Sequence, residues 1–425
     1  MTLPLVPKIV ARETALSFFS RLAAVNGLTG ARFAEDMGMS VKRIANLDEN
    51  TIRTLAELGG LDVSAREELV SWTGKGVGDV RTVFRGEEFG SRAVRSLTVR
   101  GCPICLREDV EESGLSAHRA MAMRGDWQLR DVHLCVRHHH PLVDLWTAKD
   151  PVQRSHIWSH LSVIADQLLD GAFDRARRTP TAYDLWFDKR LESGSDPTWL
   201  VSPSLFATTT FCSLLGEEIL RGTTHIDSSP AVHSADAIAI GFDIVKQGRQ
   251  AIRASLDNLA ARASGAVDKP NKAFRDLYRH LGQIYLNDES FDPFRDLLRD
   301  CILDTWPIAA GVSVLGAVLQ TRRLHSVLSA SVEIGVGTAV LARFMENASV
   351  LAIGDPRPVA RRTFDAVENA DLLLDIQSLV GSPEFRRLIG ATIGQFNGLV
   401  DDGVIMPVID DKKFSRVGDQ AMAWR

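Results

Sequence analysis

The sequence has little cysteine, little net charge and no long apolar run. Five cysteines occur among 425 residues, and Cys212 and Cys301 stand alone, which excludes the disulfide framework of a small secreted domain. A net charge of −5 argues against a protein that coats nucleic acid through many phosphate contacts. The most apolar stretch, residues 307–319, is shorter than the roughly 20 residues of a membrane-spanning helix. Because Gly311 and Gly316 interrupt it, we expect a buried helix there and no membrane contact.

Several functional signatures are also missing. The N-terminus lacks the basic start, apolar centre and cleavage site of an export signal, so we expect a cytoplasmic protein. Residues 74–78 are rich in glycine but lack the Lys-Ser or Lys-Thr ending of a phosphate-binding loop. Neither tandem repeats nor heptad runs occur. The length and composition predict a soluble globular chain of two to four domains.

Three of the cysteines lie close to one another and beside histidines. Cys102-Pro-Ile-Cys105 has the spacing at which one tight turn directs two sulfurs toward a single tetrahedral ion. Cys135-Val-Arg-His138 supplies a second pair after 29 intervening residues, among which residues 127–129 are a candidate strand. Four sulfur and nitrogen donors close the coordination sphere and leave no place for a reactive water. The pattern predicts one structural Zn²⁺ ion.

The spacing favours His138 as the fourth ligand, and alternatives stay open. His139 and His140 adjoin it, and His133 precedes Cys135 by two residues. Reduced thiols packed in a core are a second interpretation. A catalytic zinc with an open position is a third, but no His-Glu-x-x-His arrangement supplies a base. We therefore expect no catalytic residues and no enzyme activity.

Helical patterns dominate the rest of the chain. Residues 12–30 and 51–58 carry apolar side chains near helical spacing, whereas residues 74–100 are typical of a basic loop. Beyond residue 150 short apolar clusters indicate helices, with a linker at 264–272. The fold class expected is mainly α: an N-terminal helical segment with a zinc-finger module, then helical domains with helix-turn-helix-like units. The expected domains are 1–150, 151–265 and 272–425.

Four stretches in the first third of the chain together resemble the TniQ family of transposition proteins, which includes the TnsD-type target selectors. The most specific part is Cys-Pro-x-Cys-Leu followed at a distance by Cys-x-x-His-x-x-Pro-Leu. Two positions depart from the family pattern: Gly101 replaces a residue that is often bulky, and His139 replaces a frequent glycine. The matching stretches are 13–27, 55–60, 100–109 and 135–142.

The resemblance implies an adaptor and no enzyme. As the resemblance implies, members of the family recognise DNA, directly or through a DNA-bound complex. They recruit an AAA-type ATPase that loads the transposase. The partners expected for this chain are therefore DNA, such an ATPase and, indirectly, a transposase. A homodimer is compatible with this role.

Two C-terminal segments fit a helix-turn-helix template, which needs a small turn residue between two short helices. In the first segment Gly335 is the turn, and Leu341 and Phe344 face inward from a second helix over about 337–345. Thr338 and Arg343 would then face outward toward DNA. Ordinary helical packing is the alternative interpretation.

The second segment has its turn at Gly390 and a helix start at Ser382 and Pro383. Phe385, Ile389, Phe396 and Leu399 would face inward. Amide groups pair with adenine edges, hydroxyls reach phosphate, and arginines hold the backbone. The side chains expected at DNA are Thr392, Gln395, Asn397, Arg386 and Arg387, with Arg361 and Arg362 nearby.

Three functions from different classes remain. A transposition target-selection adaptor requires a neighbouring ATPase. A zinc-stabilised helix-turn-helix transcriptional regulator shares the metal and the helices but needs no ATPase. A metal-dependent hydrolase requires an open zinc site. The gene neighbourhood separates the first two, and the geometry of the metal site bears on the third.

Overall fold

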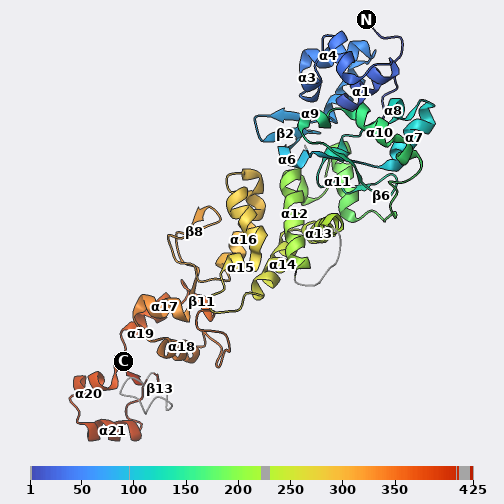
Figure 1. Cartoon of the computed structure of the whole chain (residues 1–425). Coiled ribbons are helices and arrows are strands. Elements are labelled where there is room, and N and C mark those ends of the chain that lie inside the picture. Colours follow the sequence, from blue (N-terminus) through green and yellow to red (C-terminus); the bar gives the residue numbers. More distant parts are fainter. Residues whose placement is uncertain (1, 95, 222–229, 408, 411–421, 425) are drawn as a thin grey trace. The chain divides into compact units, whose positions relative to one another are not determined.

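The computed structural model describes residues 2–94, 96–221, 230–407, 409–410 and 422–424. The protein is mainly helical, as the sequence predicts, and its short strands form small sheets of two or three. Its chain forms two compact units, residues 1–248 and 249–425, which are coloured blue to green and yellow to red in Figure 1. The expected boundaries at 150, 265 and 272 stay predictions.

A cluster of short helices opens the first unit. The first helix, α1, covers Ala15–Val25, so the predicted helix over 12–30 is real but shorter at both ends. It begins where Thr14 accepts a hydrogen bond from the Ser17 amide and ends before Gly27, whose φ is +76°. The predicted helix at 51–58 is confirmed as α4. The other members are α2 (Gly30–Asp36), α3 (Val41–Ala45) and α5 (Val63–Ser71), with α4 at Glu49–Leu58.

Residues 74–100 are not the loop that their glycines suggest. They form an antiparallel sheet of β1 (Lys75–Val77), β2 (Arg81–Phe84) and β3 (Glu87–Gly90), followed by α6 (Ser91–Val94). Phe84 and Phe89 are fully buried and form a T-shaped ring pair, and Phe84 also contacts Trp72. These tertiary contacts hold a short sheet that local composition does not reveal.

The segment that carries the cysteines alternates short strands and helices. Strand β4 (Thr98–Gly101) pairs antiparallel with β7 (Val143–Thr147). The predicted strand at 127–129 is wrong, because Asp126–Gln128 form a 3₁₀ turn, η1, in which the Trp127 ring packs over Gly101. The remaining elements are α7 (Pro103–Ser113), α8 (Ala117–Ala120), β5 (Leu134–Cys135) and β6 (His140–Pro141).

Helices complete the first unit, in agreement with the helical pattern after residue 150. The longest two, α12 and α13, approach closely through glycines: a Cβ on Gly216 would lie 1.7 Å from the Ala237 carbonyl oxygen, and one on Gly241 1.8 Å from that of Cys212. The elements are α9 (Pro151–Arg154), α10 (Ile157–Leu169), α11 (Ala182–Ser193), η2 (Trp199–Val201), α12 (Leu205–Leu220) and α13 (Pro230–Val245).

The second unit contains the C-terminal helix pairs. Its first elements are α14 (Arg249–Ala261), α15 (Pro270–Arg279), η3 (His280–Ile284), η4 (Glu289–Phe291) and α16 (Asp292–Leu303). The middle elements are β10 (Leu324–Ser326), α17 (Val327–Ile334), α18 (Thr338–Asn347), β11 (Thr363–Asp365) and α19 (Ala370–Gln377). The last elements are β12 (Val380–Gly381), α20 (Ser382–Leu388), α21 (Ile393–Asp401), β13 (Ile409–Asp410) and β14 (Met422–Trp424).

The apolar stretch 307–319 is not the buried helix that we expected. It contains a hairpin of β8 (Ser313–Val314) and β9 (Ala317–Val318). Gly311 and Gly316 have φ of +81° and +85°, which a right-handed helix does not accommodate. Among the described residues, no single helix has the length and apolar character to cross a membrane, although the bent pair α17–α18 meets both criteria together.

Candidate metal centre

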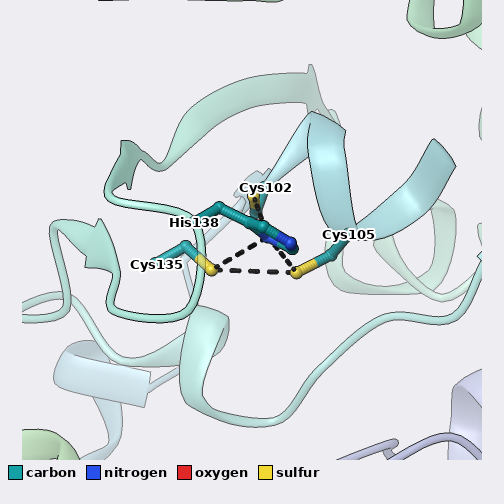
Figure 2. A group of neighbouring side chains, drawn as sticks. All are labelled: Cys102, Cys105, Cys135 and His138. Carbon is teal, nitrogen blue, oxygen red and sulfur yellow. Dashed lines mark hydrogen bonds between the residues drawn. The ribbon is translucent and has the colours of Figure 1, made fainter. Parts of the chain in front are cut away.

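Cys102, Cys105, Cys135 and His138 converge on one point in the first unit. Figure 2 shows the three sulfurs and the imidazole ring pointing toward one another from two separate segments. The four donor atoms all lie within 4.8 Å of one another, and the three cysteines are buried. This donor set can hold a metal ion.

The distances between donors fit a tetrahedral ion. With metal–sulfur and metal–nitrogen bonds of about 2.3 and 2.1 Å, tetrahedral angles separate two sulfurs by about 3.8 Å and a sulfur from a nitrogen by about 3.6 Å. The Sγ atoms of Cys105 and Cys135 are 3.7 Å apart. His138 Nδ1 lies 3.5, 3.2 and 3.6 Å from the sulfurs of Cys102, Cys105 and Cys135.

The first donor pair is placed by the junction between β4 and α7. Cys102 follows the last residue of β4 in extended conformation and is the N-cap of α7. Pro103 then starts the helix with the φ that a first turn needs, which carries Cys105 to the same side as Cys102. The preceding Gly101 has no room for a side chain: its Cβ would lie 2.8 Å from Leu145 Cδ1 and 3.1 Å from the Trp127 ring. That contact explains its departure from the bulkier residue of the family pattern.

The second pair is placed by the β5–β6 hairpin. Cys135 ends β5 and pairs with His140 of β6, so His138 lies in the turn between the strands. His139 in the same turn has φ of +55°, the left-handed region that favours glycine. This accounts for the glycine that the family often has at this position.

Glu108 decides which imidazole nitrogen faces the sulfurs. Its Oε1 lies 2.8 Å from His138 Nε2, so Nδ1 is left for the metal. A carboxylate on the remote nitrogen of a ligating histidine is the usual second contact of protein metal sites, where it fixes the ring and its tautomer. Glu108 is one helical turn beyond Cys105 in α7. The sequence interpretation missed it, although the spacing Cys105-x-x-Glu108 places both on one helix face.

The other histidines have different positions. His139 is exposed. His140 is buried, lies 2.6 Å from the Pro141 carbonyl through Nδ1, and accepts the Arg175 amide at Nε2. Burial lowers the pKa of His133 to about 4, and this residue is outside the donor cluster. Among the alternatives left open by the sequence, the geometry therefore favours His138.

The donor cluster sits on a continuous hydrophobic core. The cysteines pack with Leu106, Met123, Trp127 and Leu161, among others. Asp109 of α7 forms a buried two-pronged ion pair with Arg124, 2.5 and 2.7 Å long. Arg124 in turn bridges to the backbone at Glu13, just before α1. The metal centre is thereby tied to the N-terminal helices.

The close approach of the three thiols shifts the pKa values of Cys102 and Cys105 in opposite directions. Hydrogen bonding with Cys105 and Cys135 lowers the pKa of Cys102 to about 3, whereas hydrogen bonding with Cys102 and Cys135 raises the pKa of Cys105. A thiolate at Cys102 is therefore favoured within the cluster. A bound cation would favour the thiolate form of all three cysteines, because metal ligation requires deprotonated sulfur.

The C-terminal candidates lie in the second unit. The axes of α17 and α18 meet at 113° after Gly335, whose φ is +74°. Leu341 and Phe344 are buried as expected. Thr338 and Arg343 are half-buried, and Arg343 forms an ion pair with Glu346 at 3.3 Å.

The α20–α21 pair matches expectation in part. Its helix start at Ser382 and the burial of Phe396 are as predicted, but Ile389 is exposed and does not face inward. Thr392 and Gln395 cap α21 reciprocally, so the Gln395 Oε1 accepts from the Thr392 amide and hydroxyl. Asn397 and Arg387 are exposed, and Arg386 is half-buried.

Nearby Arg361 and Arg362 have internal contacts. Arg361 donates to the Ala263 carbonyl and lies 4.8 Å over the Trp306 ring, while Arg362 donates to the Arg357 carbonyl. Burial also lowers the pKa of Arg361.

A further helix pair escaped the sequence interpretation. Helices α2 and α3 are joined through Gly38, which has φ of +64°. Phe33, Ala34 and Ile44 are buried, while Lys42 and Arg43 are exposed on α3. The sequence pattern that could have predicted this pair is a small residue, Ala34, four positions before a glycine. Two short helices that meet at a sharp angle are often joined by a turn that contains glycine.

Comparison with known proteins agrees with this architecture. The family model TniQ matches residues 4–142, which include the N-terminal helices and all four donors. The search of curated proteins found no match. The N-terminal third of the chain is therefore a TniQ region, and the match does not extend beyond residue 142.

Proposed function

We propose that this protein is a non-catalytic transposition adaptor that binds DNA or a DNA-bound complex and recruits an AAA-type ATPase. The observation that carries the proposal is that the TniQ match ends just after the donor cluster, so that the family region and the metal module are one structure. An adaptor needs a stable scaffold and separate surfaces for its partners.

The metal in this proposal is one structural Zn²⁺ ion. Three thiolates and one imidazole are a donor set that zinc prefers, and four protein donors leave no position for a substrate. Zinc bound there contributes its binding free energy to folding. A hydrolytic role is disfavoured for the same reason, because a catalytic site keeps an open position.

Contact with DNA is proposed for the second unit. The angle between α17 and α18 falls within the range of about 90–120° typical of a helix-turn-helix. In the α20–α21 pair, Asn397 and Arg387 are exposed side chains suited to a base edge and a phosphate. Their neighbours Thr392 and Gln395 set the start of the helix through its capping box.

The alternative is a zinc-stabilised transcriptional regulator, which uses the same metal and helices. Co-purification with the AAA-type ATPase encoded beside the gene, followed by a transposition assay with and without this chain, distinguishes the two. Loss of transposition into the usual target without the chain supports the adaptor. Absence of an ATPase gene from the neighbourhood, together with binding to the chain's own promoter, would favour the regulator.

A further inference from the structure

A cavity of about 410 Å³ lies in the first unit between the N-terminal helices and the metal module. Helix α3, the segment 96–100 that leads along β4, and the start of α9 contribute to its wall. This volume is in the range of protein ligand sites, about 300–1,000 Å³. None of its lining residues is a metal donor, so the metal centre does not account for it.

The wall of the cavity is mainly apolar and includes two indole rings. Leu16, Val99, Trp127 and Trp146 are among the lining residues. The Trp146 ring stacks on His160, with centroids 4.9 Å apart. Its Nε1 atom is buried and has no hydrogen-bond partner among the residues that the structure describes. A buried N–H without a partner costs free energy.

The charged groups of the cavity have one sign. Its described lining includes Lys42, Arg100, Arg124 and Arg154, and no carboxylate. Arg124 is neutralised by Asp109. Burial lowers the pKa of Arg100, whose guanidinium donates to main-chain carbonyls of residues 129 and 130. The cavity is therefore complementary to an anion placed beside apolar groups.

We propose that this cavity is a docking site for an extended peptide of a partner protein, in which a bulky apolar side chain is followed closely by an acidic residue. The apolar side chain enters the cavity, and the carboxylate meets the exposed Lys42 and the half-buried Arg100. Segment 96–100 lines the cavity over five consecutive residues, which suits a ligand in extended conformation. The apolar lining offers little to a nucleic acid, which binds through phosphate contacts and exposed stacking platforms.

The test is a selection of random dodecapeptides, displayed on phage, against the full-length protein. Recovered peptides are synthesised with a fluorescent label and titrated by anisotropy. We expect a shared pattern of one bulky apolar residue within three positions of Asp or Glu. Proteins with ¹⁵N-labelled tryptophan indoles should show a shift of the Trp146 signal on binding, identified by its loss in Trp146→Phe.

Substitutions in the cavity test whether the peptide binds there. Ala45→Trp fills the cavity from α3, and Lys42→Glu reverses a rim charge; each should weaken binding by about tenfold or more. Lys189→Glu, at another exposed lysine outside the cavity, should leave binding unchanged. Val152→Glu at the exposed mouth repeats the test if Ala45→Trp does not fold.

Two outcomes overturn the proposal. If the selected peptides share no apolar–acidic pattern, the proposed ligand is wrong. If the cavity variants bind the peptides as tightly as the wild type does, the proposed binding site is wrong. Displacement of the peptide by a single-stranded oligonucleotide would assign the cavity to nucleic acid. The assay contains neither ATPase nor target DNA, so its result is independent of the adaptor function.

Discussion

His138 and Glu108 form a single unit: the imidazole presents Nδ1 to three sulfurs while its Nε2 lies 2.8 Å from the carboxylate Oε1. Glu108 also pairs with Arg137 at 3.0 Å, which orients the carboxylate. The ring therefore has one orientation before a metal arrives. Such outer contacts determine how tightly a metal is held.

We expect Glu108→Ala to weaken metal affinity about 10- to 100-fold without removing a donor. Competition with a chromogenic zinc chelator measures the change. Glu111→Ala is the matched control, since Glu111 is an exposed acid of the same helix outside the donor cluster. Equal affinities for the two variants would show that the contact with His138 does not tune the site.

Removal of a sulfur should have a larger effect than removal of Glu108. Cys102→Ser and Cys135→Ser each leave three donors, so we expect loss of about one zinc per chain by elemental analysis and a lower melting temperature of the first unit. Cys301→Ser tests whether the loss is specific, because Cys301 lies in α16 of the second unit. A double Cys102/Cys135 variant with unchanged melting temperature would contradict the structural role.

The donors were predictable from sequence because the relevant geometry is local. A Cys-x-x-Cys turn and a Cys-x-x-His turn each fix two ligands within four residues. The supporting contacts depend on residues far apart: Asp109 meets Arg124, and Gly101 lies under Trp127. Those contacts turn residues 126–128 into a 3₁₀ turn where propensity suggested a strand. The cavity is lined by residues far apart in the sequence, in α3 and in the segment 96–100, so no local sequence pattern predicts it.

The same distinction separates the helices from the sheets. Amphipathic spacing located α1 and α4, since one apolar stripe suffices for a helix on a core. Strands of two to four residues, such as β1–β3, are too short to show a period and are stabilised by contacts such as Phe84 with Trp72. Glycine-rich composition therefore misled the interpretation of residues 74–100.

The buried carboxyl group of Asp126 predicts how the stability of the protein changes with pH. This carboxyl is buried, and its desolvation raises the pKa from 3.8 to about 6, although Arg12 at 3.6 Å opposes the shift. The folded state then binds a proton more tightly than the unfolded chain, so this group's contribution to stability is present below pH 4 and is lost as pH rises through 6. From pH 5 to pH 8 the loss is about 1 kcal/mol.

Asp126→Asn should remove that dependence. Denaturant titration of both proteins at pH 5 and pH 8 should show that the variant gains about 1 kcal/mol relative to wild type at the higher pH. Because the comparison is a difference between two pH values, it cancels the constant cost of losing the contact with Arg12. A parallel pH dependence for both proteins would mean that Asp126 titrates normally.

The α20–α21 pair offers a test that separates base contacts from phosphate contacts, because Arg387 lies in α20 and Asn397 in α21. If the pair binds DNA as proposed, Arg387→Ala should weaken binding to all sequences alike and reduce the slope of log K against log salt by about 1. Asn397→Ala should instead cost about 1–3 kcal/mol on the preferred sequence alone, because an amide reads a base edge. Lys189→Ala, in the other unit, should change neither quantity. Unaltered binding in both the α20 and the α21 variant would transfer the DNA contact to another element, of which α18 is the next to be tested. Thr338 and Arg343 of α18 are half-buried and leave less side chain exposed for recognition.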